Sequence, residues 1–122
     1  MENKYQPLTE SLFYILLAAR KPVHGYGIIQ EVEEMTGGRV RLGAGTLYGA
    51  INTLLERGWL VLYSAELGSR KKKDYVITEE GREAFAAEMQ RLEELLRNGG
   101  KMEDTQCGCG NSPLIKMRKK SG

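Results

Sequence analysis

Residues 44–78 read AGTLYGAINTLLERGWLVLYSAELGSRKKKDYVIT, and within this stretch a helical pattern gives way to a strand pattern after Gly58. Before Gly58, apolar residues recur at the spacing of one buried helical face and predict a helix over residues 44–57: Leu47, Ile51, Leu54 and Leu55. Glycine commonly ends a helix, because it adopts the left-handed conformation without strain. Gly58 is therefore expected to close this helix.

After Gly58, residues 59–66 and 75–78 are rich in residues that favour β-strands. The connection between them, residues 67–74, contains Gly68 and Ser69, which suit a turn, and then a basic run. We therefore expect a β-hairpin with a cationic tip.

Three further segments carry apolar residues at helical spacing: residues 8–20, 25–36 and 79–97. Pro22 ends the first, because the residue before a proline avoids helical geometry, and Gly37-Gly38 ends the second. Thr78 is a good N-cap for the last.

Three helices, a hairpin and a final helix predict a mainly α (α+β) fold, the winged helix-turn-helix, over residues 1–98. Residues 99–122 are rich in glycine, polar and basic residues, so we predict a flexible tail. The tail contains Cys107 and Cys109, which are expected to stay reduced, because a disulfide between them would close a strained ring.

The face of residues 44–57 opposite the apolar stripe is small and polar, as expected of a helix that approaches the major groove of DNA closely. Gly49 favours this function, because a glycine inside a helix costs about 1 kcal/mol relative to alanine and adds nothing to a core. Asn52 is suited to an adenine edge, and Thr46 and Tyr48 are suited to phosphates. An ordinary solvated face is the alternative. The predicted contacts on this helix are Thr46, Tyr48, Gly49, Asn52 and Thr53.

Two basic clusters flank that helix. Arg39 and Arg41 precede it, and Arg70, Lys71, Lys72 and Lys73 occupy the hairpin, so both clusters are predicted to neutralise phosphates. The formal net charge is only +2, but residues 79–97 hold six Glu and three Arg. A chain with a basic face and an acidic helix can bind double-stranded DNA without a high net charge.

The apolar stripes of residues 8–20 and 79–97 are wider than a three-helix core covers. We expect them to pack against a second copy in a twofold homodimer, which makes the last helix a C-terminal dimerisation helix. The alternative is that the last helix folds back on its own domain. The residues predicted at the interface are Leu12, Ile15, Leu16, Phe85, Met89, Leu92 and Leu96.

Several classes of protein are not expected. No apolar run approaches the roughly 18–20 residues that span a membrane, and no secretory signal is present, so we expect a cytoplasmic protein. The sequence has no Gly-rich phosphate loop and no nucleophile with a plausible base, so neither an enzyme nor a cofactor is predicted. His24 is the only histidine and is expected to be structural, and no metal site is predicted.

Four segments of the chain resemble, in order, the PadR family of bacterial transcriptional regulators. They are PVHGYGI at 22–28, GTLY at 45–48, LLERGWL at 54–60 and KDYVITEEG at 73–81. The resemblance spans about residues 8–97. The length is similar to that of the family's short class, which has one dimerising helix after the wing.

The resemblance implies a DNA-binding regulator, usually a repressor of neighbouring genes. Some members respond to phenolic acids or flat hydrophobic drugs held near the dimer interface, so it also implies a small-molecule effector. By analogy, Thr46, Tyr48 and the wing residues 70–73 would contact DNA. Helices 8–20 and 79–97 would form the dimer.

The chain departs from the family pattern in three places. Gly43-Ala44 stands where many members have Ser-Pro, and Gly49 stands where many have Pro. Trp59 lies at the start of the wing, whereas drug-binding relatives can use a tryptophan on the last helix.

Two other hypotheses stay open at this level. One is a winged-helix module that binds a protein and not DNA, which the near-neutral charge allows. The other is a thiol- or metal-responsive regulator that acts through Cys107 and Cys109.

Overall fold

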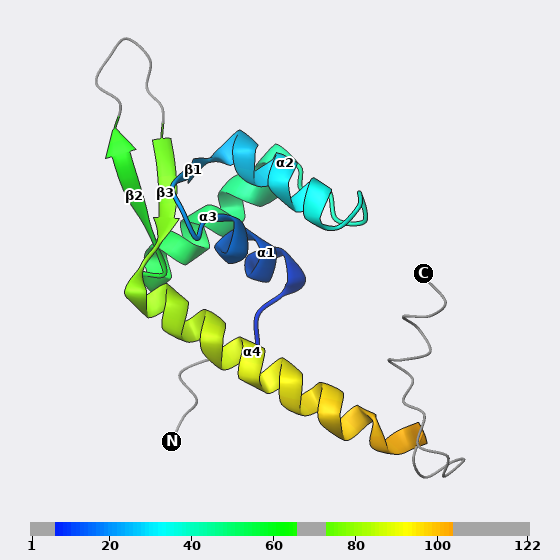
Figure 1. The fold of residues 1–122 in the computed structure, drawn as a ribbon. Helices are drawn as coiled ribbons and strands as arrows, with labels where there is room; N and C mark the ends of the chain where they lie inside the picture. The colour runs from blue at the N-terminus through cyan, green and yellow to red at the C-terminus, as the bar shows by residue number, and fades with distance from the viewer. Residues whose placement is uncertain (1–6, 66–72, 104–122) are drawn as a thin grey trace. The chain divides into compact units, whose positions relative to one another are not determined.

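A computed structural model describes residues 7–65 and 73–103 of the chain. Its elements follow the predicted order, with one short strand added (Figure 1). They are α1 (Glu10–Ala18), β1 (Val23–His24), α2 (Gly25–Met35), α3 (Ala44–Arg57), β2 (Leu60–Ala65), β3 (Lys73–Ile77) and α4 (Glu79–Gly99). The predicted mainly α fold with a hairpin is confirmed.

Helix bounds differ from the prediction at both ends of the domain. α1 begins at Glu10 rather than at residue 8, because Thr9 is its N-cap and accepts a hydrogen bond from the Leu12 amide at 3.1 Å. α4 continues to Gly99, and residues 101–103 are also helical. Helix therefore extends past the predicted end at residue 97. Residues 104–122, including Cys107 and Cys109, lie outside the described residues.

Contacts divide the chain into unit 1, Met1–Glu88, and unit 2, Met89–Gly122, and α4 crosses the boundary. In unit 1, α1, α2 and α3 pack around one core. Leu47, Ile51 and Leu54 of α3 are buried there, as their spacing predicted. Ile15 and Leu16 of α1 and Ile28 and Val32 of α2 are fully buried in the same core.

The sheet of unit 1 is antiparallel with the strand order β1-β3-β2. Leu60 pairs with Ile77 and Leu62 with Tyr75, and the register shifts between Leu62 and Ser64. Val23 of β1 pairs with Tyr75 from the other side, which ties the start of α2 to the wing. β2 is consequently an edge strand.

One joint connects α3, the wing and α4. Gly58 ends α3 with a φ of 79°, the left-handed cap that the sequence predicted. The Thr78 hydroxyl donates to the Gly58 carbonyl at 2.7 Å and accepts from the Gly81 amide at 2.9 Å. Thr78 thus caps α4 as predicted and also holds the end of α3.

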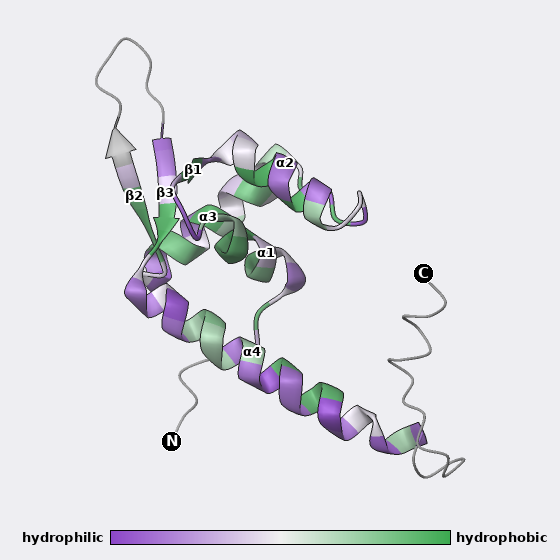
Figure 2. Cartoon of the chain, viewed as in Figure 1, coloured by the Kyte–Doolittle hydropathy of each residue, from purple (hydrophilic) through white to green (hydrophobic). Residues whose placement is uncertain are grey.

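Unit 2 contains the rest of α4, where apolar residues recur among hydrophilic ones (Figure 2). Met89, Leu92, Leu95 and Leu96 are exposed on this part of the helix. Within the described residues, every helix is too short or too polar to cross a membrane.

Candidate nucleic-acid interface

α3 presents a polar face to solvent. The exposed residues are Gly45, Thr46, Tyr48, Gly49 and Asn52. Of the apolar stripe, Leu47, Ile51 and Leu54 are buried and Leu55 is half-buried. Thr53 is half-buried, and its hydroxyl donates to the Gly49 carbonyl at 3.2 Å. The Thr53 side chain therefore has only acceptor capacity left for a ligand.

Packing within the described chain does not require glycine at Gly45 or Gly49 of α3. A Cβ atom added at Gly45 or Gly49 would meet no described atom within 4 Å. Gly43, the N-cap residue, is open in the same way. Because a helical glycine is about 1 kcal/mol less favourable than alanine, the open face lowers the stability of α3 without improving its packing.

The helices of the helix-turn-helix differ from the others at their N-termini. Thr9 and Thr78 cap α1 and α4 through their hydroxyls. Within the described chain, no side chain caps α2 at His24 or α3 at Gly43. The first backbone N–H groups of α2 and α3 therefore lack side-chain acceptors, and such groups bind anions readily.

Tyr48 lies against the start of α2. A Cβ atom added at Gly25 would collide with the Tyr48 hydroxyl and come within 2.9 Å of the ring carbon Cζ. Burial and the nearby Tyr48 raise the pKa of Tyr75 above its ordinary value. Tyr48 therefore extends from the exposed face of α3 toward the α2 terminus and the wing strand.

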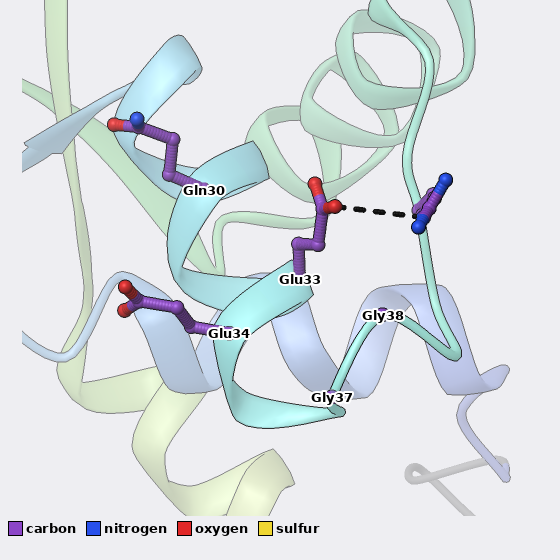
Figure 3. A pocket seen from close by; sticks show the side chains of 6 residues that line it. Gln30, Glu33, Glu34, Gly37 and Gly38 are labelled. Atoms are coloured by element: carbon purple, nitrogen blue, oxygen red, sulfur yellow. Dashed lines mark ion pairs between the residues drawn. The ribbon is translucent and has the colours of Figure 1, made fainter.

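The two arginines before α3 are exposed, but each faces a carboxylate. Arg39 pairs with Glu10 of α1, and the Arg41 Nε atom lies 3.5 Å from Glu33 Oε2 of α2. The second pair closes a shallow depression beside the Gly37-Gly38 turn (Figure 3). Prediction from sequence treated both arginines as free cations and missed Glu10 and Glu33.

The wing is described only in part. Lys73, at the start of β3, is exposed, and the predicted contacts Arg70, Lys71 and Lys72 lie outside the described residues. On the edge strand β2, Val61, Leu62 and Tyr63 are exposed. The described part of the wing thus presents apolar side chains of the edge strand as well as the basic side chain of Lys73.

The residues predicted at a dimer interface divide into three groups by their exposure in the single chain. Ile15 and Leu16 have no exposed area within the single chain, so their place in that prediction is corrected: they belong to the protomer core. A helical stripe reports a buried face but does not say what buries it, which explains the error. Leu12 and Phe85 are half-buried, and Met89, Leu92 and Leu96 are exposed.

α1, β3 and the first turns of α4 line an apolar cavity in unit 1 that is partly open to solvent. Its volume is about 220 Å³, and two arginines, Arg20 and Arg82, stand among its apolar walls. The walls are formed by Leu16, Leu17, Ile77, Phe85 and Ala86. Phe85 stacks on Phe13 of α1, with ring centroids 4.7 Å apart.

Comparison with protein families identifies the group to which this architecture belongs. The model of the transcriptional regulator PadR-like family matches residues 14–87, more than half of the chain. The chain belongs to the PadR-like family. This PadR-like chain is therefore a DNA-binding transcription regulator and not an enzyme, and the predicted family and winged-helix fold are confirmed.

Solved structures of other regulators resemble this PadR-like chain. A PadR-family regulator from Eggerthella lenta is 24% identical with a TM-score of 0.68, and the alignment covers 79% of this chain and 83% of the other. A transcriptional regulator from Thermoplasma acidophilum is 26% identical with a TM-score of 0.59, covering 77% and 89%. Bacillus subtilis PadR bound to operator DNA is 22% identical with a TM-score of 0.56, covering 63% and 46%. No curated protein sequence matched the chain.

Among the described residues of this PadR-like regulator, no group of three or more His, Cys, Asp and Glu could hold a metal ion. Two features were not predicted from the sequence. One is the contact of the Tyr48 side chain with Gly25, and the other is the pairing of Arg39 and Arg41 with the carboxylates of Glu10 and Glu33. Gly25, in the first turn of α2, was the only local signal for the contact with Tyr48. Glu10 and Arg39 are 29 residues apart, and nothing local in the sequence links them.

Proposed function

We propose that this PadR-like regulator binds its operator by inserting α3 into the major groove. The open glycines carry the proposal: Gly45 and Gly49 weaken an exposed helix, no described atom packs on them, and the close approach of another molecule gives them a use. Close approach then brings Asn52 to base edges, where its amide fits adenine. Gly49 and Thr53 lie on the same stretch of α3 and complete the groove contacts.

Phosphates are bound around α3 in this proposal. The uncapped α3 terminus offers N–H groups and a favourable helix dipole, and Thr46 adds a hydroxyl. In this proposal, Tyr48 reaches the DNA backbone beside the N-terminus of α2. The basic contacts before the helix and on the wing are Arg39, Arg41, Arg70, Lys71, Lys72 and Lys73.

The regulator acts as a homodimer in this proposal. Met89, Leu92 and Leu96 are exposed on α4, and an apolar seam of this kind is stabilised by a second copy. Leu12 and Phe85 are the interface residues proposed from unit 1. A twofold dimer reads two half-sites about 34–36 Å apart, so the operator is expected to be palindromic.

We also propose that the regulator is a cytoplasmic repressor whose release from DNA is triggered by a small ligand. The apolar cavity of unit 1 supports this proposal. Its volume of about 220 Å³ suits a single-ring compound, since a cavity of roughly 150 Å³ accepts benzene. Arg82 favours an acidic group on that ring, whereas Arg20 already pairs with Glu31 at 3.0 Å.

The first test measures binding to DNA upstream of the regulator's own gene against a scrambled duplex, in a salt series. Selective binding that weakens steeply with salt supports the proposal. Gly49→Leu places a bulky side chain on the open face and should abolish operator binding without lowering the melting temperature. Selective binding by Gly49→Leu with unchanged affinity would refute the placement of α3.

The exposed residues Val61, Leu62 and Tyr63 on the edge strand β2 favour a second candidate, a winged-helix module that binds a protein. Replacing Arg70, Lys71, Lys72 and Lys73 with alanine separates the two candidates. A DNA-binding wing then loses affinity for every duplex and shows a weaker salt dependence. A protein-binding module shows neither change.

A further inference from the structure

The turn between α2 and α3 holds its two arginines against carboxylates of the same chain. Arg39 donates from Nη2 to Glu10 in the first turn of α1, and Arg41 faces Glu33 on α2 at 3.5 Å. Both arginines precede Ala44, the first residue of α3, by only a few positions. The two arginines that precede the proposed recognition helix are therefore paired with carboxylates in the free protein.

These pairs are weak enough to exchange. The arginine side chains are 61% and 71% exposed, and their partners Glu10 and Glu33 are 53% and 46% exposed. Water and salt screen ion pairs at such positions. A DNA phosphate presents the same kind of oxygen acceptors to a guanidinium as a carboxylate does, so it can take the carboxylate's place.

The backbone around the arginines is held independently of the pairs. The Thr36 hydroxyl donates to the Val32 carbonyl at 2.9 Å and accepts from the Val40 amide at 3.0 Å. The Arg39 amide donates to the Thr36 carbonyl at 3.1 Å. Exchange of partner therefore needs side-chain rotation and not a change of the turn.

The hydrogen bond between Arg39 and Glu10 favours the charged form of both groups. The hydrogen bond from Arg39 lowers the pKa of Glu10 below its ordinary value, and the same bond raises the pKa of Arg39. Both groups are thus charged at neutral pH, where DNA binding takes place.

We infer that Glu10 and Glu33 compete with DNA phosphates for Arg39 and Arg41 and thereby limit the affinity of the regulator for DNA of any sequence. The inference rests on the proposed function, because it assigns these arginines to phosphates. A phosphate contact contributes to binding at every sequence, so the competition lowers operator and random affinities by the same factor. Weak sequence-independent binding leaves more free regulator in a genome with roughly 10⁶–10⁹ competing sites.

The test compares Glu33→Gln and Glu10→Gln with Glu34→Gln. Glu34 follows Glu33 on α2 and lines the same depression, but it points to another side of the helix (Figure 3). Within the described part of the chain Glu34 forms no ion pair, so Glu34→Gln gives the same change of charge without releasing an arginine. Affinity is measured by fluorescence anisotropy with an operator duplex and a scrambled duplex of equal length.

Glu33→Gln and Glu10→Gln should each bind both duplexes about two- to fivefold more tightly than Glu34→Gln at low salt. The gain should shrink as salt rises, and the ratio of operator to scrambled affinity should stay constant. In an Arg41→Ala background, Glu33→Gln should lose its advantage over Glu34→Gln, because the competed group is gone. Melting temperatures of the variants show whether each one is folded.

Three results would overturn the inference while the proposed function stands. Glu33→Gln and Glu10→Gln could match Glu34→Gln, could bind more weakly because the carboxylates orient the arginines toward DNA, or could gain affinity for the operator alone. A wild-type chain that binds neither duplex at about 50 mM salt would overturn the proposed function, and this inference with it.

Discussion

Replacing Gly81 with alanine tests the joint between the wing and α4. Gly81 is buried, and a Cβ atom there would collide with the Trp59 carbonyl oxygen and lie 2.8 Å from Ile77 Cγ1. The Trp59 oxygen cannot easily move away, because it accepts a hydrogen bond from the Thr78 amide at 2.9 Å. The first turn of α4 therefore has to shift away from the wing.

The size of the effect follows from two opposing terms. Overpacking a tight site costs about 1–3 kcal/mol, and alanine recovers up to about 1 kcal/mol of helix propensity. Because the clash is with a backbone oxygen that cannot easily move, the upper part of the overpacking range applies, about 2–3 kcal/mol, and the net loss is about 1–2 kcal/mol in the free energy of unfolding. For a domain of this size, such a loss lowers the melting temperature by about 3–12 °C.

The assay is thermal unfolding followed by circular dichroism, at one fixed protein concentration because a dimer's melting temperature depends on concentration. Gly49→Ala is the matched control, since a Cβ atom there meets no described atom within 4 Å. The control should melt about 3–6 °C higher than the wild type. A Gly81→Ala variant that melts at or above the wild-type temperature would refute the close approach of α4 to the wing.

Three other predictions concern the cap of α4, its apolar seam and the Glu10 pair. Thr78→Ala removes two hydrogen bonds and should lower the free energy of unfolding by about 1–2 kcal/mol. Thr78→Ser keeps a hydroxyl and should retain most of the wild-type stability, and urea unfolding measures both variants. Leu92→Glu should convert the proposed dimer to monomer in sedimentation equilibrium, whereas Glu93→Gln beside it should not, and a monomeric wild type would contradict the prediction. Because Arg39 lowers the pKa of Glu10 from 4.5, the pair stabilises the fold above pH 4.5 and loses that effect as pH falls through the lowered pKa. The difference in melting temperature between wild type and Glu10→Gln should therefore be present at pH 7 and vanish in strong acid, and a difference that grows in acid would exclude the pair.

Local patterns in the sequence predicted most of the fold. The spacing of Leu47, Ile51 and Leu54 reports one buried helical face, which needs no knowledge of what packs on it. Gly58 and Thr78 were predictable as caps because capping depends on backbone geometry within a few residues. The exposure of Gly45 and Gly49 was also predictable, because both lie on the face of α3 opposite its apolar stripe.

Features that depend on distant contacts were not predictable. β1 has two residues, and only its pairing of Val23 with Tyr75 makes it a strand. The burial of Ile15 and Leu16 looked in sequence like an interface, because a helical stripe is the same whether its own domain or a second copy covers it. The pairing of Arg39 with Glu10 appears only once α1 and the turn after α2 are brought together.

The Thr78 hydroxyl has a consequence for how a signal would travel through this regulator. It bonds the C-terminal cap of α3 and the first turn of α4 at once, so it links the end of α3 directly to the start of α4. In the proposed dimer, a ligand that changes the angle at which two α4 helices meet would swing each α3 through the same joint. The distance between the two α3 helices, and with it the fit to successive turns of DNA, would change without any helix having to unfold.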